Sequence, residues 1–304
     1  MGRNRDFKLI HYPRTALLQR DRIYVQEDRG MNMAKSKTVL ITGASSGIGK
    51  ATALYFQQQG WNVIATMRDP EHGKELRALD QVLVTSLDVT NSDSIQQAVK
   101  TGLERLQSIG VLVNNAGFGA YGPLEATSME TVRRQFDTNV IGLLETTKAV
   151  LPHFRAQHSG VIVNISSIGG KVTFPLGTLY HGTKFAVEGI SESLSYEMQA
   201  IGVKVKIVEP GAIKTDFATR SFAFSNDESL AEYQKIVKGL MTAVEPMMAN
   251  GADPLVVAEI IYKAATDGLD QLRYPAGSDA APLLEKRRNE DDHTFMAETL
   301  ANFS

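Results

Sequence analysis

Three side chains between positions 167 and 184 could carry out acid/base chemistry together. Ser167 is followed after twelve residues by Tyr180, and after three more by Lys184. A tyrosine hydroxyl has a pKa of about 10, so it exchanges protons poorly near neutral pH unless a cation favours its ionised form. Residues four apart share one face of an α-helix, and Lys184 is therefore expected to lie beside Tyr180 and lower its pKa. The serine would add a second hydroxyl from the preceding loop.

A glycine-rich turn lies earlier in the chain. The apolar run Thr38–Ile41 predicts a strand, and the residues from Lys50 to Gln59 predict a helix. Glycines between them would allow a tight turn and a close approach to a pyrophosphate, whose charge the free amides and the helix dipole stabilise. The spacing Gly-x-x-x-Gly-x-Gly differs from the usual dinucleotide fingerprint, so the turn alone is a weak indication. Its residues are Gly43, Ser45, Ser46, Gly47, Ile48 and Gly49.

Short apolar runs then alternate with longer helical ones. Strands are expected over 62–67, 82–88, 111–114, 161–166 and 203–208, with a last short one over 271–274. Helices are expected over 93–106, 129–154, 180–200 and 254–265. The apolar character of the strands indicates burial on both faces. We therefore expect an α/β fold, a single Rossmann-type doubly wound parallel sheet with helices on both faces.

Ligands of such sheets bind beyond the carboxyl ends of the strands. The glycine turn follows the first expected strand, and polar or glycine motifs end the strands after it. These motifs include Arg68, Asp88, Asn114–Gly117, Ser167 and Pro210–Gly211. They are therefore expected to converge on one edge of the sheet.

Together these motifs resemble the short-chain dehydrogenase/reductase family. The resemblance runs in the family's order from about Lys37 to Tyr274. It implies an oxidoreductase that interconverts a carbonyl and an alcohol with a nicotinamide cofactor and no metal. The stretch from Tyr180 to Leu194 is similar to the hydroxysteroid and retinol dehydrogenase branch.

The resemblance also implies roles for individual residues. Tyr180 would exchange the proton, Ser167 would bind the substrate oxygen, and Lys184 would also hold the nicotinamide ribose. Ser166 is the alternative to Ser167, whose distance from Tyr180 is the family's usual one. Asn139 would hold a water of a proton relay, or would be a polar residue satisfied inside a kinked helix. Besides the glycine turn, the cofactor would contact Arg68, Asp88, Val89, Asn115, Ala116, Gly117, Tyr180, Lys184, Pro210, Gly211, Ile213 and Thr215.

The end of the second expected strand bears on the choice of cofactor. A carboxylate at its last residue would select NAD(H), but that position holds Met67, and Arg68 follows. A guanidinium can bind the 2′-phosphate of NADP(H). We therefore expect NADP(H) rather than NAD(H), and carbonyl reduction because the cellular pool of this cofactor is usually reduced. The competing interpretation gives the ribose to Asp69. Asp88 would bind adenine; the simpler interpretation of the stretch 88–91 is a helix N-cap, and the two are compatible.

The substrate is expected to be a small apolar carbonyl or alcohol. Phe174 and Leu176 lie between Ser167 and Tyr180, and Phe217 follows the last cofactor residue. A lid over about 216–250 has apolar residues at helical spacing, which fits either a ligand or the core. Its apolar residues give no specific substrate.

Composition bounds the remaining possibilities. The 304 residues are 43% hydrophobic with a formal net charge of −2, which shows no footprint of a nucleic-acid partner. There are no cysteines, so disulfides and thiol chemistry are excluded. No apolar run reaches the length of about 18 residues that a membrane span needs, and we expect a cytoplasmic protein. The family resemblance implies a homodimer or homotetramer through the helices over 129–154 and 180–200.

We expect one catalytic domain over 36–276. Residues 1–35 would be a loose extension, and 277–304 a C-terminal tail. A second class of function uses the same fold without turnover, as an NADP-binding regulatory protein. The intact set Asn139, Ser167, Tyr180 and Lys184 favours the enzyme.

Overall fold

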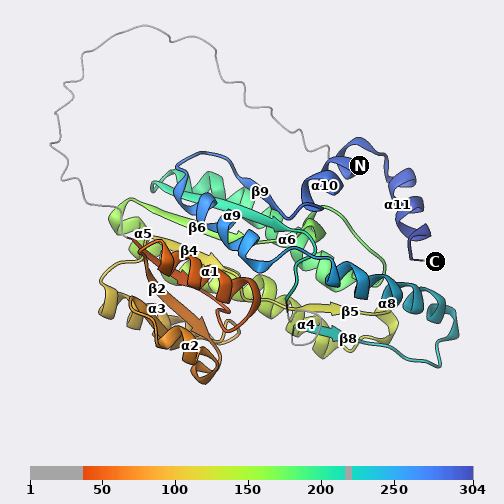
Figure 1. Cartoon of the computed structure of the whole chain (residues 1–304), viewed down its shortest axis with the longest axis horizontal. Helices are drawn as coiled ribbons and strands as arrows, with labels where there is room; N and C mark the ends of the chain where they lie inside the picture. The colour runs from red at the N-terminus through yellow and green to blue at the C-terminus, as the bar shows by residue number, and fades with distance from the viewer. Residues whose placement is uncertain (1–36, 216–220, 304) are drawn as a thin grey trace, which may run out of the picture. The chain divides into compact units, whose positions relative to one another are not determined.

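A seven-stranded parallel sheet forms the centre of the computed structural model, which describes residues 37–215 and 221–303. The strand order is β3-β2-β1-β4-β6-β7-β9 (Figure 1). The strands are β1 (Thr38–Ile41), β2 (Asn62–Met67), β3 (Val82–Ser86), β4 (Val111–Asn114), β6 (Gly160–Ile165), β7 (Val203–Pro210) and β9 (Arg273–Ala276). The expected doubly wound α/β fold is confirmed.

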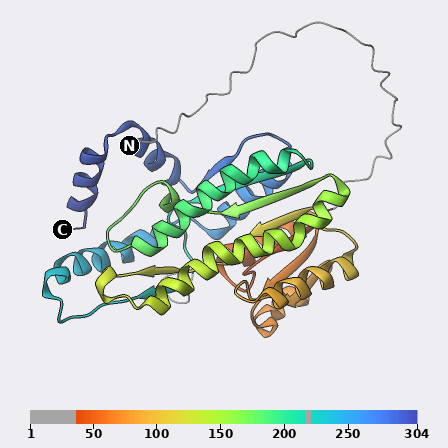
Figure 2. The same ribbon diagram turned by 180° about the vertical axis from the view of Figure 1, so that it is seen from behind.

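Helices cover both faces of this sheet (Figures 1 and 2). They are α1 (Gly47–Gln58), α3 (Ser92–Leu106), α5 (Gly142–Gln157), α6 (Thr178–Gln199) and α9 (Pro254–Thr266). Successive residues of β1 point to opposite faces. Val39 and Ile41 pack in the cluster that includes residues of α1 and α9, and Leu40 packs in the cluster under α3, α5 and α6. The apolar runs in the sequence follow from this burial on both sides.

The single helix expected over 129–154 is interrupted. It forms α4 (Met129–Phe136) and α5, joined by a π-helical turn over Asp137–Ile141. Within this turn the N–H of Gly142 donates to the carbonyl of Asp137. Such turns accommodate one extra residue and are frequent at functional sites. This one holds Asn139.

A second sheet of two strands was not expected from the sequence. β5 (Gly119–Tyr121) and β8 (Phe222–Phe224) pair in parallel, with Gly119 opposite Phe222 and Tyr121 opposite Phe224. The ribbon joins the segment after β4 to the segment that follows Thr215. It therefore fixes part of the expected lid to the region beyond the sheet edge.

The remaining helices are short or lie late in the chain. They are α2 (Lys74–Arg77), α8 (Gln234–Ala249) in the expected lid, α10 (Ala280–Asn289) and α11 (Asp292–Ala301). Single helical turns cover Pro70–Gly73, Leu124–Ala126, Ile168–Gly170 and Ala231–Tyr233. Residues 277–303, expected as a tail, thus include two helices. Among the described residues, no helix is both long and apolar enough to cross a membrane.

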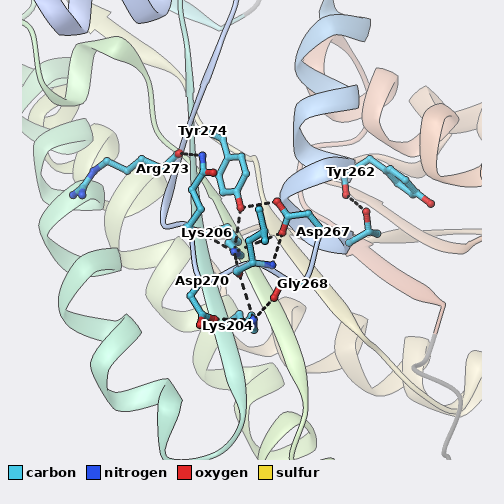
Figure 3. Close-up of polar contacts among 11 residues, drawn as sticks. Lys204, Lys206, Tyr262, Asp267, Gly268, Asp270, Arg273 and Tyr274 are labelled. Carbon is cyan, nitrogen blue, oxygen red and sulfur yellow. Dashed lines mark hydrogen bonds and ion pairs between the residues drawn. The ribbon is translucent and has the colours of Figure 1, made fainter.

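A buried lysine organises the connection between α9 and β9 (Figure 3). Lys206 of β7 is 1% exposed, and its Nζ donates to the carbonyls of Leu269 at 2.5 Å and Gln271 at 2.7 Å. The hydroxyl of Tyr274 lies 3.1 Å from the same Nζ and donates to Asp267 at 2.9 Å. Because buried charge is tolerated only when it is paired and hydrogen-bonded, this cluster fixes the path of the chain into β9.

Candidate active site

A cavity of about 580 Å³ lies at the carboxyl edge of the sheet. That volume is in the usual range for small-molecule sites. Every residue assigned above to the cofactor lines it, from the glycine turn to Thr215. Ser167, Tyr180, Lys184 and Phe174 line it as well. The expected convergence of the motifs on one edge of the sheet is therefore what the structure has.

Ser167, Tyr180 and Lys184 meet in this cavity. The hydroxyl of Ser167 hydrogen-bonds that of Tyr180, and the Ser167 oxygen also accepts from the N–H of Gly169 at 3.0 Å. Lys184 donates from Nζ to the carbonyl of Ile165 at 2.9 Å, and this Nζ lies 5.7 Å from the centre of the Tyr180 ring. The alternative Ser166 also lines the cavity, but its buried hydroxyl has no hydrogen-bond partner among the described residues.

Burial dominates the electrostatics of this group. It raises the pKa of Tyr180 from its ordinary value, and the hydrogen bond from Ser167 acts in the opposite direction. It also lowers the pKa of Lys184 to about 8, against the charge of Glu188, which raises it. The expectation that Lys184 would bring the pKa of Tyr180 down is therefore not what this structure shows. Desolvation disfavours the phenolate more than the neighbouring groups favour it.

Asn139 is buried in the π-helical turn and does not line the cavity. Its Oδ1 accepts from the N–H of Phe118 at 3.0 Å, while Nδ2 donates to the Phe118 carbonyl at 2.9 Å and to the Thr183 hydroxyl at 3.2 Å. Both amide hydrogens are thus used within the protein. The second interpretation above, a polar residue satisfied inside a kinked helix, describes this side chain.

The glycine turn is shaped for close approach. Gly43 has a φ of +69°, and a Cβ on Gly49 would lie 2.3 Å from the carbonyl oxygen of Gly43. Neither position accepts a larger residue without distortion. Ser46 precedes α1 without a side-chain capping bond, and the first turn of α1 holds no acidic residue. The helix N-terminus therefore keeps amides for an anion, which fits a pyrophosphate.

Asn115 acts on this turn from the neighbouring strand end. Its Nδ2 donates to the carbonyls of Thr42 at 2.9 Å and Gly43 at 3.1 Å. The Thr42 hydroxyl in turn accepts from the N–H groups of Asn115 and Ala116, both at 3.0 Å. The side chain of Asn115 thus ties the glycine turn to the end of β4 while its residue lines the cavity.

Arg68 and Asp69, the two candidates for contact with the cofactor ribose, have different surroundings in the structure. Arg68 lines the cavity, is exposed and makes no ion pair with any described residue. Asp69 does not line it, because this residue caps the next helical turn by accepting from the N–H of Glu71 at 2.9 Å. The buried Met67 occupies the last position of β2.

The stretch 88–91 after β3 caps the next helix, as its simpler interpretation expected. The N-cap of α3 is Asn91, whose side chain accepts from the N–H of Ser94 at 2.8 Å. Asp88 instead accepts from the N–H of Thr90 at 2.9 Å and from its hydroxyl at 2.7 Å. These bonds hold its carboxylate at the cavity wall.

The other end of the cavity is apolar. Besides Phe174, its wall includes Tyr121 and Phe222, whose rings stack with centres 5.2 Å apart, and Met247 and Met248 of α8. Leu176 was expected here but does not line the cavity. Its φ is +62°, and its carbonyl accepts the N–H of Gly122, so it forms a turn. Phe217 lies outside the described residues.

Sequence reasoning missed two residues next to the predicted ones. His181 lines the cavity directly after Tyr180, and it is 3% exposed. Glu188, one helical turn after Lys184, is buried against Arg273 at 2.9 Å and Lys171 at 3.6 Å. The four-residue spacing from Lys184 could have placed Glu188 on the same helix face as Lys184. No sequence signal distinguishes His181 from a solvated histidine.

Comparison with known proteins agrees with this architecture. The short chain dehydrogenase family model matches residues 37–226. Among curated proteins, an uncharacterised oxidoreductase of Schizosaccharomyces pombe is 48% identical over 231 residues, covering 76% of this chain and 97% of the relative. A 3-ketodihydrosphingosine reductase of Bacteroides thetaiotaomicron is 38% identical, with coverage of 83% and 91%. Retinol dehydrogenase 8 of Bos taurus is 34% identical, with coverage of 86% and 88%.

Solved structures include close matches to the fold. A short-chain dehydrogenase from Streptomyces avermitilis superposes with a TM-score of 0.76 and 34% identity, covering 88% of this chain and 96% of the other. A serine dehydrogenase complexed with NADP+ superposes with a TM-score of 0.69 and 29% identity, covering 79% and 94%.

Proposed function

Because this chain belongs to the short-chain dehydrogenase/reductase family, we propose that it is an NADP(H)-dependent oxidoreductase that interconverts a carbonyl and an alcohol on an apolar small molecule. The observation that carries this proposal is the hydrogen-bonded pair Ser167 and Tyr180 beside Lys184, in a cavity that begins at a glycine turn. A hydroxyl pair and an ammonium are what proton exchange with a carbonyl oxygen needs.

In this proposal each residue has one task. Tyr180 transfers its hydroxyl proton to the substrate oxygen during reduction and removes it during oxidation. Ser167 donates a hydrogen bond to the same oxygen, and Lys184 adds a positive charge beside the tyrosine ring. When bound, the nicotinamide ring supplies or accepts the hydride at the carbon. A relay role for Asn139 would use its backbone, because both hydrogens of its side-chain amide are taken.

The raised pKa of Tyr180 supports reduction as the working direction. A tyrosine whose pKa is raised by burial stays protonated at neutral pH and can act as the acid. We expect reduction to proceed at a constant rate through neutral pH. Oxidation of the corresponding alcohol should accelerate as the pH rises, because it requires the deprotonated side chain. Initial rates in both directions across the pH range test this, and an oxidation rate that is already maximal at neutral pH would contradict it.

The preference for NADP(H) rests on Arg68. Its guanidinium stands at the cavity without an ion-pair partner among the described residues, whereas Asp69 is engaged in capping. A bidentate pair with a 2′-phosphate would satisfy this cation. The related serine dehydrogenase was solved with NADP+.

Replacing Arg68 by Leu should weaken NADPH binding by about one to two orders of magnitude and leave NADH binding nearly unchanged, since a hydrogen bond to a charged group contributes about 1.5–3 kcal/mol. Asp69→Asn is the matched variant, because Asn also caps helices, and it should alter neither affinity. Fluorescence titration of the wild type and of both variants with NADPH and with NADH measures the dissociation constants. Equal losses for NADPH and NADH in Arg68→Leu would show that the cation does not read the phosphate.

An apolar substrate is supported by the cavity wall beyond the serine and tyrosine. Tyr121, Phe174 and Phe222 supply aromatic surface, and Met247 and Met248 supply adaptable apolar side chains. Two of the curated relatives are named for apolar substrates, a sphingoid ketone and retinol. We infer a hydrophobic aldehyde or ketone without choosing between these skeletons.

Turnover of NADPH with a panel of aldehydes and ketones tests the proposal. The panel should span short and long alkyl chains, with steroid and retinoid carbonyls, and be run in both directions. Oxidation of NADPH that depends on a carbonyl supports an enzyme. Tight NADPH binding with no turnover across the panel would instead support the regulatory protein.

We also propose a homodimer or homotetramer through α4, α5 and α6. Phe136, Ile141, Phe185 and Tyr196 are exposed apolar or aromatic side chains on or between these helices. Exposed apolar side chains that form one patch mark interaction sites, and this proposal assigns these four to the interface. Light scattering coupled to size exclusion measures the mass, and a monomer at micromolar concentration would contradict the proposal.

A further inference from the structure

The loop between Ser167 and Tyr180 must be held in place if both side chains are to meet. Residues 168–170 form a single helical turn, and the segment then extends to Gly177 before α6 begins. Phe174 stands in the middle of this segment and lines the apolar end of the cavity. Whatever fixes Phe174 also shapes the space for the substrate.

His181 makes two of the hydrogen bonds that hold this loop. Its Nε2 accepts the N–H of Phe174 at 3.0 Å, and its Nδ1 lies 3.0 Å from the carbonyl oxygen of Gly169. An amide N–H only donates and a carbonyl only accepts, so the imidazole is neutral with its proton on Nδ1. Burial lowers the pKa of His181, which is consistent with this neutral form.

The loop encloses the imidazole closely. A Cβ on Gly177 would lie 2.4 Å from Cδ2 of His181, and one on Gly169 would lie 3.0 Å from Nδ1. A side chain at Gly177 would overlap the imidazole ring, and one at Gly169 would crowd it. This enclosure explains why the residue is 3% exposed although it lies on a helix next to the cavity.

Aromatic rings also contact His181 and Phe174. The centre of the His181 ring lies 5.6 Å from that of Phe174, 5.7 Å from Tyr180 and 6.1 Å from Tyr121. On its other side, the Phe174 ring lies 6.0 Å from the ring of Phe303, which follows α11. Phe174 is thus held between the imidazole and the end of the C-terminal helix.

We propose that His181 is a positioning residue that fixes the 168–177 loop and, through Phe174, sets how well the cavity accepts an apolar substrate. It acts through the loop and does not touch the reacting atoms. Its meaning for catalysis rests on the proposed function, whereas the hydrogen bond to Phe174 can be measured without turnover. Its loss should raise KM for a long apolar carbonyl more than it lowers kcat.

Two variants separate the hydrogen bonds of the imidazole. In His181→Gln the amide oxygen can reach the position of Nε2 and accept from Phe174. In His181→Asn the shorter amide can reach only the position of Nδ1, so the contact with Gly169 is kept and the Phe174 amide loses its acceptor. Both variants remove the ring, which makes each the control for the other.

Hydrogen exchange of the Phe174 amide, followed by NMR, is the primary measurement. We expect protection in the wild-type chain and in His181→Gln, and exchange about 3- to 10-fold faster in His181→Asn, the range that the loss of one net hydrogen bond implies. KM for decanal relative to butanal should rise in His181→Asn and recover in His181→Gln.

Each outcome decides the proposal. Equal exchange in the two folded variants would overturn it. If His181→Asn failed to fold, an unprotected Phe174 amide in the wild-type chain or in His181→Gln would overturn it. Protection that follows the pattern above supports the positioning role. Absence of turnover with both aldehydes in the wild-type chain would count against the proposed carbonyl chemistry and would leave the exchange result valid.

Discussion

Replacing Tyr180 by Phe is expected to lower kcat by about 10²- to 10⁴-fold, the contribution usual for a positioned acid or base. The change deletes one oxygen, which exchanges the proton with the substrate and hydrogen-bonds Ser167. The ring and its contacts with Tyr121 and His181 remain, with centres 5.5 Å and 5.7 Å away. NADPH affinity should therefore be nearly unchanged. Steady-state rates and cofactor titration on the same preparation measure both quantities.

The matched control removes a tyrosine hydroxyl elsewhere. Tyr262 of α9 packs its ring against Phe56 and Trp61, outside the cavity, and Tyr262→Phe should leave kcat close to wild type. A Tyr180→Phe enzyme that kept a substantial share of its turnover would show that another group supplies the proton. An equal loss in both variants would point to a general effect on stability.

Lys206→Met is expected to destabilise the fold by about 3–5 kcal/mol, the cost typical of removing one partner from a buried charged cluster. Methionine fills a similar volume but donates no hydrogen bond. The carbonyl of Gln271 would lose its donor, and that of Leu269 would keep the 3.3 Å contact from Lys204 Nζ. Asp267 would keep the Tyr274 hydroxyl and the Leu269 N–H (Figure 3). Urea denaturation followed by circular dichroism measures the free energy of unfolding.

Lys204→Met provides the comparison on the same strand. Lys204 lies two residues earlier, and its Nζ pairs with the exposed Asp270 at 2.8 Å and donates to the carbonyls of Gly268 at 2.5 Å and Leu269 at 3.3 Å (Figure 3). These contacts are solvent-exposed, and an exposed pair contributes about 0–1 kcal/mol, so this variant should lose much less stability than Lys206→Met. Similar losses in the two variants would mean that burial of the Lys206 cluster is not what stabilises the connection between α9 and β9.

The parts that could be predicted from sequence are local or follow from strand ends. The strand Thr38–Ile41, the glycine turn and the helix after it are consecutive in the chain. The continuous apolar run of the strand differs clearly from the helical spacing of apolar residues after the turn. Ser167 could be placed beside the glycine turn because carboxyl ends of parallel strands share one edge, and Tyr180 beside Lys184 because residues four apart share one face of a helix. Which of Arg68 and Asp69 faces the cavity could be learned only from the structure, because the capping bond of Asp69 shows where its carboxylate points.

Three features depended on contacts that no periodicity encodes. The strands β5 and β8 have three residues each and pair across about a hundred positions, so neither run is long enough to show alternation. Their stacked rings Tyr121 and Phe222 were therefore not recognised as one wall. The raised pKa of Tyr180 comes from burial by several elements at once, and the loop around His181 closes only in three dimensions.

The π-helical turn over Asp137–Ile141 has a consequence for the phase of the helix that contains it. An α-helix advances about 100° per residue, and the turn takes up one residue more than α-helical geometry allows. The side chains of α4 are therefore rotated about the helix axis by roughly 100° relative to those of α5, compared with an unbroken α-helix over the same residues. Deleting a single residue here would restore a straight helix but would rotate either α4 away from β5 or α5 away from the sheet. Insertion or deletion of one residue in this turn is therefore expected to disturb the packing of α4 and α5 more than a substitution at one of their exposed positions.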